Sequence, residues 1–447
     1  MRAESNVAEL GRLVRLALPI AVAQLGLISM MLVDTAVIGR VSVADLAGAG
    51  IGRSIGFTSI IVGIGVTTGL EPLAAQAVGA GEHGRAWGGY VTNLRATLLL
   101  WAPAMALAFA VTLALSPLGV EADVVHRVRS YLVGQAPGFA ASLAYLSSKT
   151  FLQAHGRTTP ALAGSAVANV VNLVVCNLLV RGDGALRAVG LAPRGLPALG
   201  ALGGGLAFSV ASFILLAFVA FPAHAYRARG GGERVSLATA YRLGLPVGFQ
   251  LLAEMGIFSL AAVLAGSLGA EVASAHQVAI GLASFTFMGA LGVSGATAVR
   301  VGHAIGAGTS PRHAGFLGIA LGVAGMSFGA IAFVAFPAPL VRVFSDDPRV
   351  VAIGIDLLRI AGLFQLFDGM QVVAAGALRG AGDVRFPFVT NVLGHWAVGF
   401  PVALTLGFGL HMGARGLWWG LTSGLVVVSV VLALRFAALS KRAIARV

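Results

Sequence analysis

Residues 13–38 read LVRLALPIAVAQLGLISMMLVDTAVI, and this stretch decides the fold. About 20 consecutive apolar residues are enough to cross the hydrocarbon core of a bilayer as an α-helix. The stretch is also too long for the core of a cleavable signal peptide, so it predicts a first transmembrane helix. Eleven further stretches of this kind follow, at 48–78, 90–116, 130–152, 161–180, 198–223, 243–267, 274–299, 314–341, 353–378, 388–409 and 414–437.

The composition of the 447-residue chain agrees with twelve such helices. Hydrophobic residues make up 57% of it and charged residues only 11%, whereas a typical soluble domain has about 25% charged residues. Too few charges are present to cover a soluble protein of this length. Because catalytic signatures and nucleotide-binding motifs are also missing, we expect neither an enzyme nor an ATP-driven pump. The sequence therefore predicts an all-α polytopic membrane protein.

The loops explain the net charge of +13. A basic stripe with interleaved aromatic residues is missing, so we expect no nucleic-acid partner. Lys and Arg accumulate in the cytoplasmic loops of membrane proteins, and they accumulate here if both termini are cytoplasmic. The strongest contributions come from residues 227–242 and from the C-terminal tail, with Arg435, Lys441, Arg442 and Arg446. This pattern predicts a multi-pass protein of the bacterial inner membrane, surrounded by lipid.

An internal repeat divides the chain into two halves. At an offset of 227 residues, Pro19 falls on Pro246 and Gly79-Ala80-Gly81 falls on Gly306-Ala307-Gly308. Six helices in each half would enter the membrane from the same side, which predicts lobes related by a pseudo-two-fold axis along the membrane normal. Such lobes rock against each other in some transporters, and a pseudo-dimer of this kind can work as a monomer, which is the state we expect here. The expected parts are an N-terminal lobe at 1–226, a cytoplasmic linker at 227–242 and a C-terminal lobe at 243–447.

Acidic residues inside these helices call for a functional or structural explanation, because inserting each of them into the membrane costs about 2.5–3.5 kcal/mol on insertion scales. Glu254 and Asp368 lie near the middle of their helices, and Asp34 lies in the outer half of the first helix. We expect all three to take part in cation coupling, and Glu254 and Asp368 to offer the hard oxygen ligands that suit Na⁺. For Asp34 the alternatives are a protonated acid bonded to a neighbouring helix and a pair with Arg40. Glu71 instead indicates an interfacial or helix-positioning acid.

Other polar or aromatic residues of the helices are candidates for secondary contacts with substrate or ion. They are Gln250, Gln277, Gln365, Asn172, Asn177 and Phe364. Polar side chains inside a bundle often only tie helices together, and aromatic ones often only pack or face lipid. Both interpretations stay open for these positions.

Several motifs together resemble those of the multidrug and toxic compound extrusion (MATE) family, and in particular its bacterial NorM-like branch. The matching stretches are Leu18-Pro19 with Asp34-Thr35, the run from Pro72 to Gly81, Ala275-His276-Gln277-Val278-Ala279, Arg300-Val301-Gly302-His303 and the run from Gln371 to Gly380. The resemblance covers nearly the whole chain. It implies twelve helices in two lobes and export of amphipathic organic cations, driven by inward Na⁺ or H⁺.

The resemblance also implies roles for the acids. Glu254 and Asp368 match the cation site of NorM-like members, and Asp34 matches a protonation site found in other members. Two positions depart from the pattern: Cys176 stands where many relatives have an aspartate, and Phe364 stands where NorM-like members often have a tyrosine. The choice between Na⁺ and H⁺ therefore stays open, and no cofactor beyond this ion is expected. The alternative is a flippase of lipids or lipid-linked oligosaccharides from the same superfamily, although the unpaired acids favour a cationic cargo.

Overall fold

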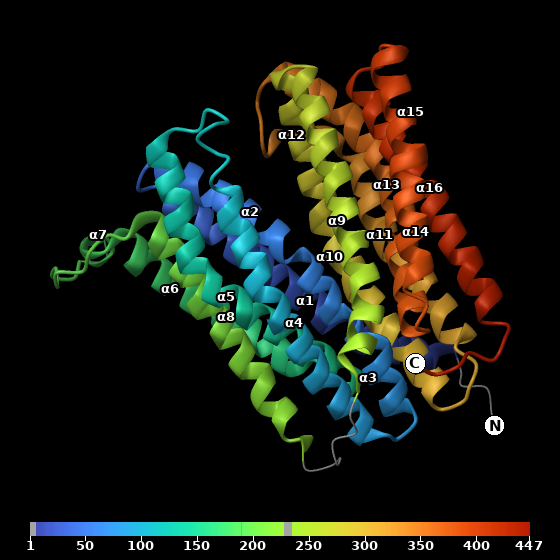
Figure 1. Cartoon of the computed structure of the whole chain (residues 1–447). Coiled ribbons are helices and arrows are strands. Elements are labelled where there is room, and N and C mark those ends of the chain that lie inside the picture. Colours follow the sequence, from blue (N-terminus) through green and yellow to red (C-terminus); the bar gives the residue numbers. More distant parts are fainter. Residues whose placement is uncertain (1–5, 189, 228–234) are drawn as a thin grey trace. The chain divides into compact units, whose positions relative to one another are not determined.

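The computed structural model describes residues 6–188, 190–227 and 235–447, and the regular elements of these residues are all helices (Figure 1). Residues 228–234 of the predicted linker lie outside the described part of the chain. The predicted all-α class is therefore confirmed. A chain of apolar helices satisfies its backbone hydrogen bonds internally, as a segment in hydrocarbon must.

The helices follow the apolar stretches of the sequence closely. The first half contains α1 (Asn6–Ile38), α2 (Val43–Thr68), α3 (Leu70–Gly79), α4 (His83–Val111), α5 (Ala122–Ala154), α6 (Thr159–Arg181), α7 (Asp183–Ala188) and α8 (Gly200–His224). The second half contains α9 (Leu237–Ser267), α10 (Ala270–Gly306), α11 (Arg312–Ala335), α12 (Pro337–Arg342), α13 (Pro348–Gly380), α14 (Arg385–Val392), η2 (Leu393–Gly399), α15 (Phe400–Leu404), η3 (Thr405–Gly409) and α16 (Ala414–Leu439).

Eleven helical segments of the described chain are long and apolar enough to cross a membrane. In this tally α2 and α3 form one segment, and the elements from α14 to η3 form another. The remaining long helix is α5, with 33 residues, which is more polar because it contains Gln135, Lys149 and Gln153. With α5, the described segments correspond to the twelve predicted ones.

The described helices form two compact units. One contains the chain up to Val22, together with Glu71–Glu82 and Phe249–Val447. The other contains Ala23–Leu70 and His83–Gly248. We call these unit 1 and unit 2. Unit 1 thus takes the first turns of α1 and nearly all of α3 in addition to helices of the second half, and the predicted lobe borders stay a prediction.

Two prolines mark places where the chain passes from one unit to the other. Pro19 lies inside α1 shortly before the border at Val22, and Pro246 lies inside α9 shortly before the border at Gly248. A proline inside a helix removes one backbone hydrogen bond and bends the helix. These prolines are also one repeat apart, so both halves of the chain have a proline inside their first long helix.

Small residues allow the helices of each unit to pack closely. In unit 2, α5 packs along α8, where Gly134 faces the backbone of Leu202 and Leu206, and the Gly138 amide donates to Ser209 Oγ at 2.8 Å. In unit 1, α13 packs between α10, α11 and α16 (Figure 1). Glycine and serine at helix contacts are typical of membrane bundles, because they let two backbones approach.

The helical segment before α16 is irregular. It begins as α14, continues through the π-helical turns of η2, and passes through α15 into a second π-helical stretch, η3. Wider turns of this kind often accompany functional sites. Here they directly follow Asn391, a buried residue in the last turns of α14.

We expect Gly134→Leu to destabilise the protein. A Cβ atom at this position would lie 2.7 Å from the Leu202 carbonyl oxygen, and overpacking of this kind costs about 1–3 kcal/mol. The measurement is the Tm of the purified protein in detergent. Gly50→Leu on α2 is the matched control, because a Cβ atom there meets no other atom within 4 Å. Equal Tm values for the two variants would contradict this packing argument.

Candidate functional site

Glu254 on α9 accepts hydrogen bonds from amide groups of three helical segments. Gln250, one turn earlier on α9, donates through Nε2 to Glu254 Oε1 at 3.2 Å. Gln371 on α13 donates through Nε2 to the same oxygen at 2.9 Å, and Asn391 on α14 donates through Nδ2. The helix spacing of four places Gln250 on the face of Glu254, as the sequence suggested. The carboxylate therefore sits in a polar site built from α9, α13 and α14.

Two amide oxygens of this site are free to accept a further hydrogen bond or to bind a cation within the described part of the chain. Gln371 Oε1 and Asn391 Oδ1 are buried and lack a hydrogen-bond partner within the part of the chain that the structure describes. Buried polar atoms normally have a partner, so two orphan oxygens beside a carboxylate need an explanation. Carboxylate and amide oxygens are the ligands that hard cations such as Na⁺ prefer. The residues therefore fit a small hard cation or a protonated, water-filled site.

Asp368 belongs to the same region of unit 1. It lies on α13 three residues before Gln371, on the same face of the helix, and Gln371 donates to Glu254. Within the described ranges, its carboxylate has no hydrogen-bond partner, and the residue is only partly buried. Two like charges in apolar surroundings repel each other, so a cation or a proton bound beside them relieves the repulsion.

The other candidates in unit 1 lie in three different environments. Gln365 is buried on α13 and donates to Thr286 Oγ1 of α10, while its carbonyl oxygen lacks a partner among the described residues. Phe364 is buried in an aromatic core, with its ring centroid 5.8 Å from that of Trp418. Gln277 is exposed on α10. The structure thus places Gln250 beside Glu254, whereas Phe364 is a packing residue of the aromatic core.

A second acidic cluster lies in unit 2. Asp34 on α1 lies near Asn172 and Cys176 of α6, and all three residues are buried. Asp34 Oδ1 and both amide atoms of Asn172 have no hydrogen bond within standard distance in the described chain. Asn177 is not part of this arrangement, since its amide donates to Leu173 O of its own helix at 2.8 Å. The cluster combines an acid, an amide and a thiol in a buried place.

The structure adds a cation that sequence spacing does not indicate. Arg53 on α2 donates to Thr35 Oγ1 at 2.9 Å and to the Tyr131 hydroxyl at 3.3 Å. Thr35 is the neighbour of Asp34 in α1, so Arg53 brings a positive charge into this region of unit 2. Arg40, the partner considered from the sequence, is exposed.

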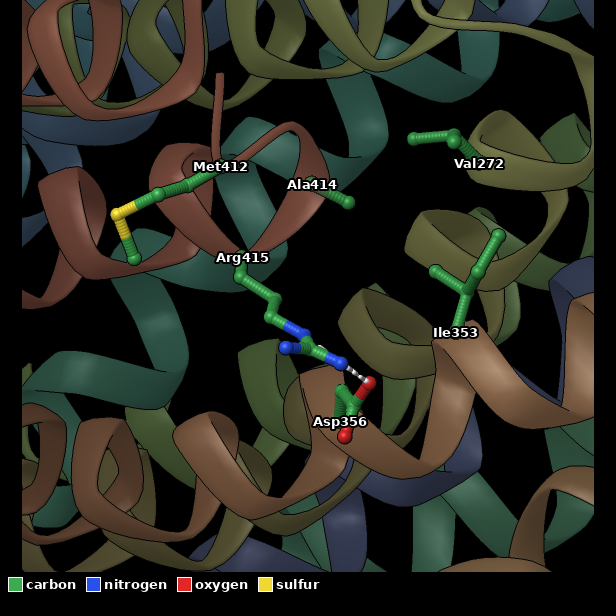
Figure 2. Close-up of a pocket in the computed structure, with 6 residues that line it drawn as sticks. All are labelled: Val272, Ile353, Asp356, Met412, Ala414 and Arg415. Carbon is green, nitrogen blue, oxygen red and sulfur yellow. Dashed lines mark hydrogen bonds and ion pairs between the residues drawn. The ribbon is translucent and has the colours of Figure 1, made fainter. Parts of the chain in front are cut away.

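A small pocket in unit 1 lies near the start of α13, at some distance along that helix from Asp368. It has a volume of about 160 Å³, and it is lined by Val272, Ile353, Asp356, Met412, Ala414 and Arg415. Figure 2 shows Arg415 directed at Asp356, with Nη2 2.5 Å and Nε 3.0 Å from Oδ2. The acid of this pocket is thus paired, unlike Asp368. An exposed ion pair of this kind contributes little to stability.

Apolar helices in this number, with acids placed among them in both units, define a polytopic membrane transporter. The family model MatE matches the chain twice, at residues 19–178 and at residues 246–405. The chain therefore belongs to the MatE family. Both ends of the second match lie 227 residues after those of the first, which confirms the repeat predicted from the sequence.

Curated relatives agree with this assignment. A probable multidrug resistance protein NorM of Deinococcus radiodurans is 37% identical over 447 residues, which cover 97% of this chain and 96% of the relative. The multidrug resistance protein NorM of Burkholderia vietnamiensis is 35% identical over 442 residues, covering 94% of this chain and 92% of the relative. The chain is therefore NorM-like, as its motifs suggested.

Solved structures of MATE transporters share the fold. The eukaryotic transporter AtDTX14 superposes with a TM-score of 0.84 at 21% identity, covering 98% of this chain and 99% of that one. The transporter VcmN of Vibrio cholerae, in its bent form, gives a TM-score of 0.82 at 20% identity, covering 98% of each chain. These likenesses show the architecture of the chain.

We expect Asn391→Leu to weaken the Glu254 site. It removes a donor to the carboxylate and one orphan oxygen, and a hydrogen bond to a charged group contributes about 1.5–3 kcal/mol. The ion concentration for half-maximal transport in liposomes should rise about tenfold or more. Asn177→Leu is the matched control, because Asn177 bonds only within its own helix turn. An unchanged ion dependence in well-folded Asn391→Leu protein would contradict this role.

Proposed function

We propose that this protein is an antiporter that exports amphipathic organic cations in exchange for inward Na⁺ or H⁺. The observation that carries the proposal is that Glu254 and Asp368 both lie in unit 1, where Glu254 accepts hydrogen bonds from Gln371 and Asn391, whose amide oxygens lack partners in the described part of the chain. Such acids are costly inside a membrane, and they typically mark ion pathways or proton relays. The names of the relatives support drugs as the cargo.

The proposed mechanism is alternating access. A cation or a proton at Glu254 and Asp368 removes negative charge, which lowers the attraction of the site for a positively charged drug. Ion and drug must favour opposite transitions, since a ligand shifts a conformational equilibrium only through its different affinity for the two states. Inward ion flow then drives drug release to the outside. Asp34 is proposed as a further coupling acid, in unit 2.

The proposal includes the setting of the protein. We place it in the inner membrane as a monomer with cytoplasmic termini, because the loop arginines favour this orientation. Gln250 and Gln365 are proposed as polar contacts of the ion or substrate. Asn172 has the corresponding role near Asp34.

Flux measurements in liposomes test the proposal. We expect an imposed Na⁺ or pH gradient to drive uptake or release of a fluorescent organic cation by the wild-type protein. Glu254→Gln and Asp368→Asn should reduce this flux to that of protein-free liposomes, because they remove the charge that the ion neutralises. The flux of the Asp34→Asn variant measures how much the acid of unit 2 contributes to gradient-driven transport.

The controls separate coupling from folding. Asp356→Asn removes an acid of the same unit that is paired with Arg415, and it should retain flux. If neither gradient moves an organic cation in the wild-type protein, the antiporter proposal fails. Transfer of lipid-linked oligosaccharides across the same liposomes would then support the flippase alternative.

A further inference from the structure

Three basic side chains lie exposed at one end of unit 1, where α11 begins and α16 ends. Arg312 is the first residue of α11, and Lys441 and Arg442 follow the cap residue Ser440 directly after α16. All three side chains are exposed, and none of them forms an ion pair within the described part of the chain. Their positive charge is therefore not used to hold the fold together.

Aromatic contacts bring the two helix ends together. The guanidinium carbon of Arg312 lies 5.4 Å from the centroid of the Phe316 ring, within the range of a cation–π contact. The Phe316 ring lies 5.7 Å from that of Phe436 on α16. One turn later, the Ser440 amide donates to Phe436 O at 2.9 Å. The two basic residues after Ser440 thus follow the helix end against which the first turn of α11 packs.

The backbone that carries these two residues is held on both sides. The amides of Lys441 and Arg442 donate to carbonyl groups in the last turn of α16, at 3.4 and 3.1 Å. Further along, Ile444 packs against the core of unit 1, and the Val447 amide donates to Gln76 Oε1 of α3 at 2.9 Å. The charges therefore project from an ordered turn.

The acids at this end of unit 1 already have other partners. Among the described residues, each acid of the neighbouring helix ends forms an ion pair with an arginine outside the group of three. The pairs are Glu9 with Arg300, Glu71 with Arg379, Glu82 with Arg446 and Asp383 with Arg435. An anionic group from outside the chain would therefore complement the three remaining charges.

The two helices next to these charges expose apolar stripes. Exposed side chains recur at spacings of three or four residues, which places them on one face of each helix. On α11 they are Arg312, Phe316, Ala320, Ala324, Phe328 and Ile331, and on α16 they are Val427, Val430, Leu434, Ala438 and Lys441. Phe328 is 78% exposed and Leu434 is 64% exposed. Each stripe is apolar along the helix and basic at the same end of unit 1.

We propose that Arg312, Lys441 and Arg442 bind the headgroup of an anionic phospholipid whose acyl chains lie along the exposed stripes of α11 and α16. A lipid with a negative headgroup has this same division into a charged end and an apolar length, and basic groups at the membrane surface attract such lipids. The orientation proposed above places the site at the cytoplasmic leaflet. The inference goes beyond the antiporter function and does not depend on it.

Lipid titration of the purified, delipidated protein tests the proposal. Native mass spectrometry counts bound phosphatidylglycerol and, separately, bound phosphatidylcholine with the same acyl chains. Each Lys or Arg near an anionic lipid surface strengthens the attraction about fivefold. We therefore expect Arg312→Gln/Arg442→Gln to weaken phosphatidylglycerol binding about tenfold or more and to leave phosphatidylcholine binding unchanged.

Matched variants separate this site from general charge effects. Arg342→Gln/Arg349→Gln removes two exposed arginines near the junction of α12 and α13, and it should retain phosphatidylglycerol binding. Arg312→Lys/Arg442→Lys keeps the charges and should bind within about threefold of the wild type, because an ammonium group also binds phosphate. Unchanged binding in Arg312→Gln/Arg442→Gln, or an equal loss in Arg342→Gln/Arg349→Gln, would overturn the proposal.

A soluble headgroup distinguishes a lipid from a free phosphate. Glycerol phosphate carries the negative charge without acyl chains, so it should compete with phosphatidylglycerol only at concentrations about a hundredfold higher or more, given the apolar contacts it lacks. Competition at equal concentration would show an anion site that needs no acyl chains, and the lipid assignment would be wrong.

Photo-cross-linking covers the case in which the arginine variants fail to fold. Ala320 lies exposed on the α11 stripe, one turn beyond Phe316. In a Cys176→Ala background, Ala320→Cys is labelled with a benzophenone maleimide, in liposomes with equal amounts of phosphatidylglycerol and phosphatidylcholine. We expect illumination to attach phosphatidylglycerol about threefold or more in excess. Attachment of the two lipids in equal amounts would contradict the site.

Discussion

The burial of a carboxylate among apolar helices is the constraint on which the rest of the structure depends. Glu254 needs polar partners because hydrocarbon offers none, and it finds them on three segments: its own helix, α13 through Gln371 and α14 through Asn391. The same bonds fix the depth of these segments relative to each other. Neutralising the acid therefore changes both the charge and the interactions that hold the helices in register.

The sequence identified the acids but only part of their surroundings. Glu254 and Asp368 were predictable because a lone acid in an apolar helix is costly, and Gln250 was predictable from helical spacing. Asn391 lies 137 residues from Glu254, so its role required the packed structure. In the sequence, Asn391 is only an amide inside an apolar helix, and the same pattern is found for residues that merely tie helices together. Arg53 was missed because it belongs to another helix than Asp34.

Two of the three helices that carry these acids, α1 and α9, continue from one unit into the other. In α1, Glu9 lies on the unit 1 side of Pro19 and binds Arg300, whereas Asp34 lies in unit 2. In α9, Glu254 lies in unit 1, beyond Pro246. A bend at a proline changes the direction of a helix without unfolding it. Glu254 and Asp34 thus lie on helices that both units share, whereas Asp368 lies on a helix of unit 1 alone.

The internal repeat reproduces the scaffold but not the chemistry. Its offset of 227 residues superimposes the helix prolines and the family matches, yet the three acids have no acidic counterparts. The positions one repeat away from Glu254, Asp368 and Asp34 are Leu27, Ala141 and Ala261. The two halves thus share a similar helical frame but carry their acids at different positions of the repeat. The surroundings of the acids differ as well: Glu254 accepts hydrogen bonds from three amide groups, whereas Arg53 donates to Thr35, the neighbour of Asp34. The two halves therefore share a helical frame and differ in the polar groups that surround their acids.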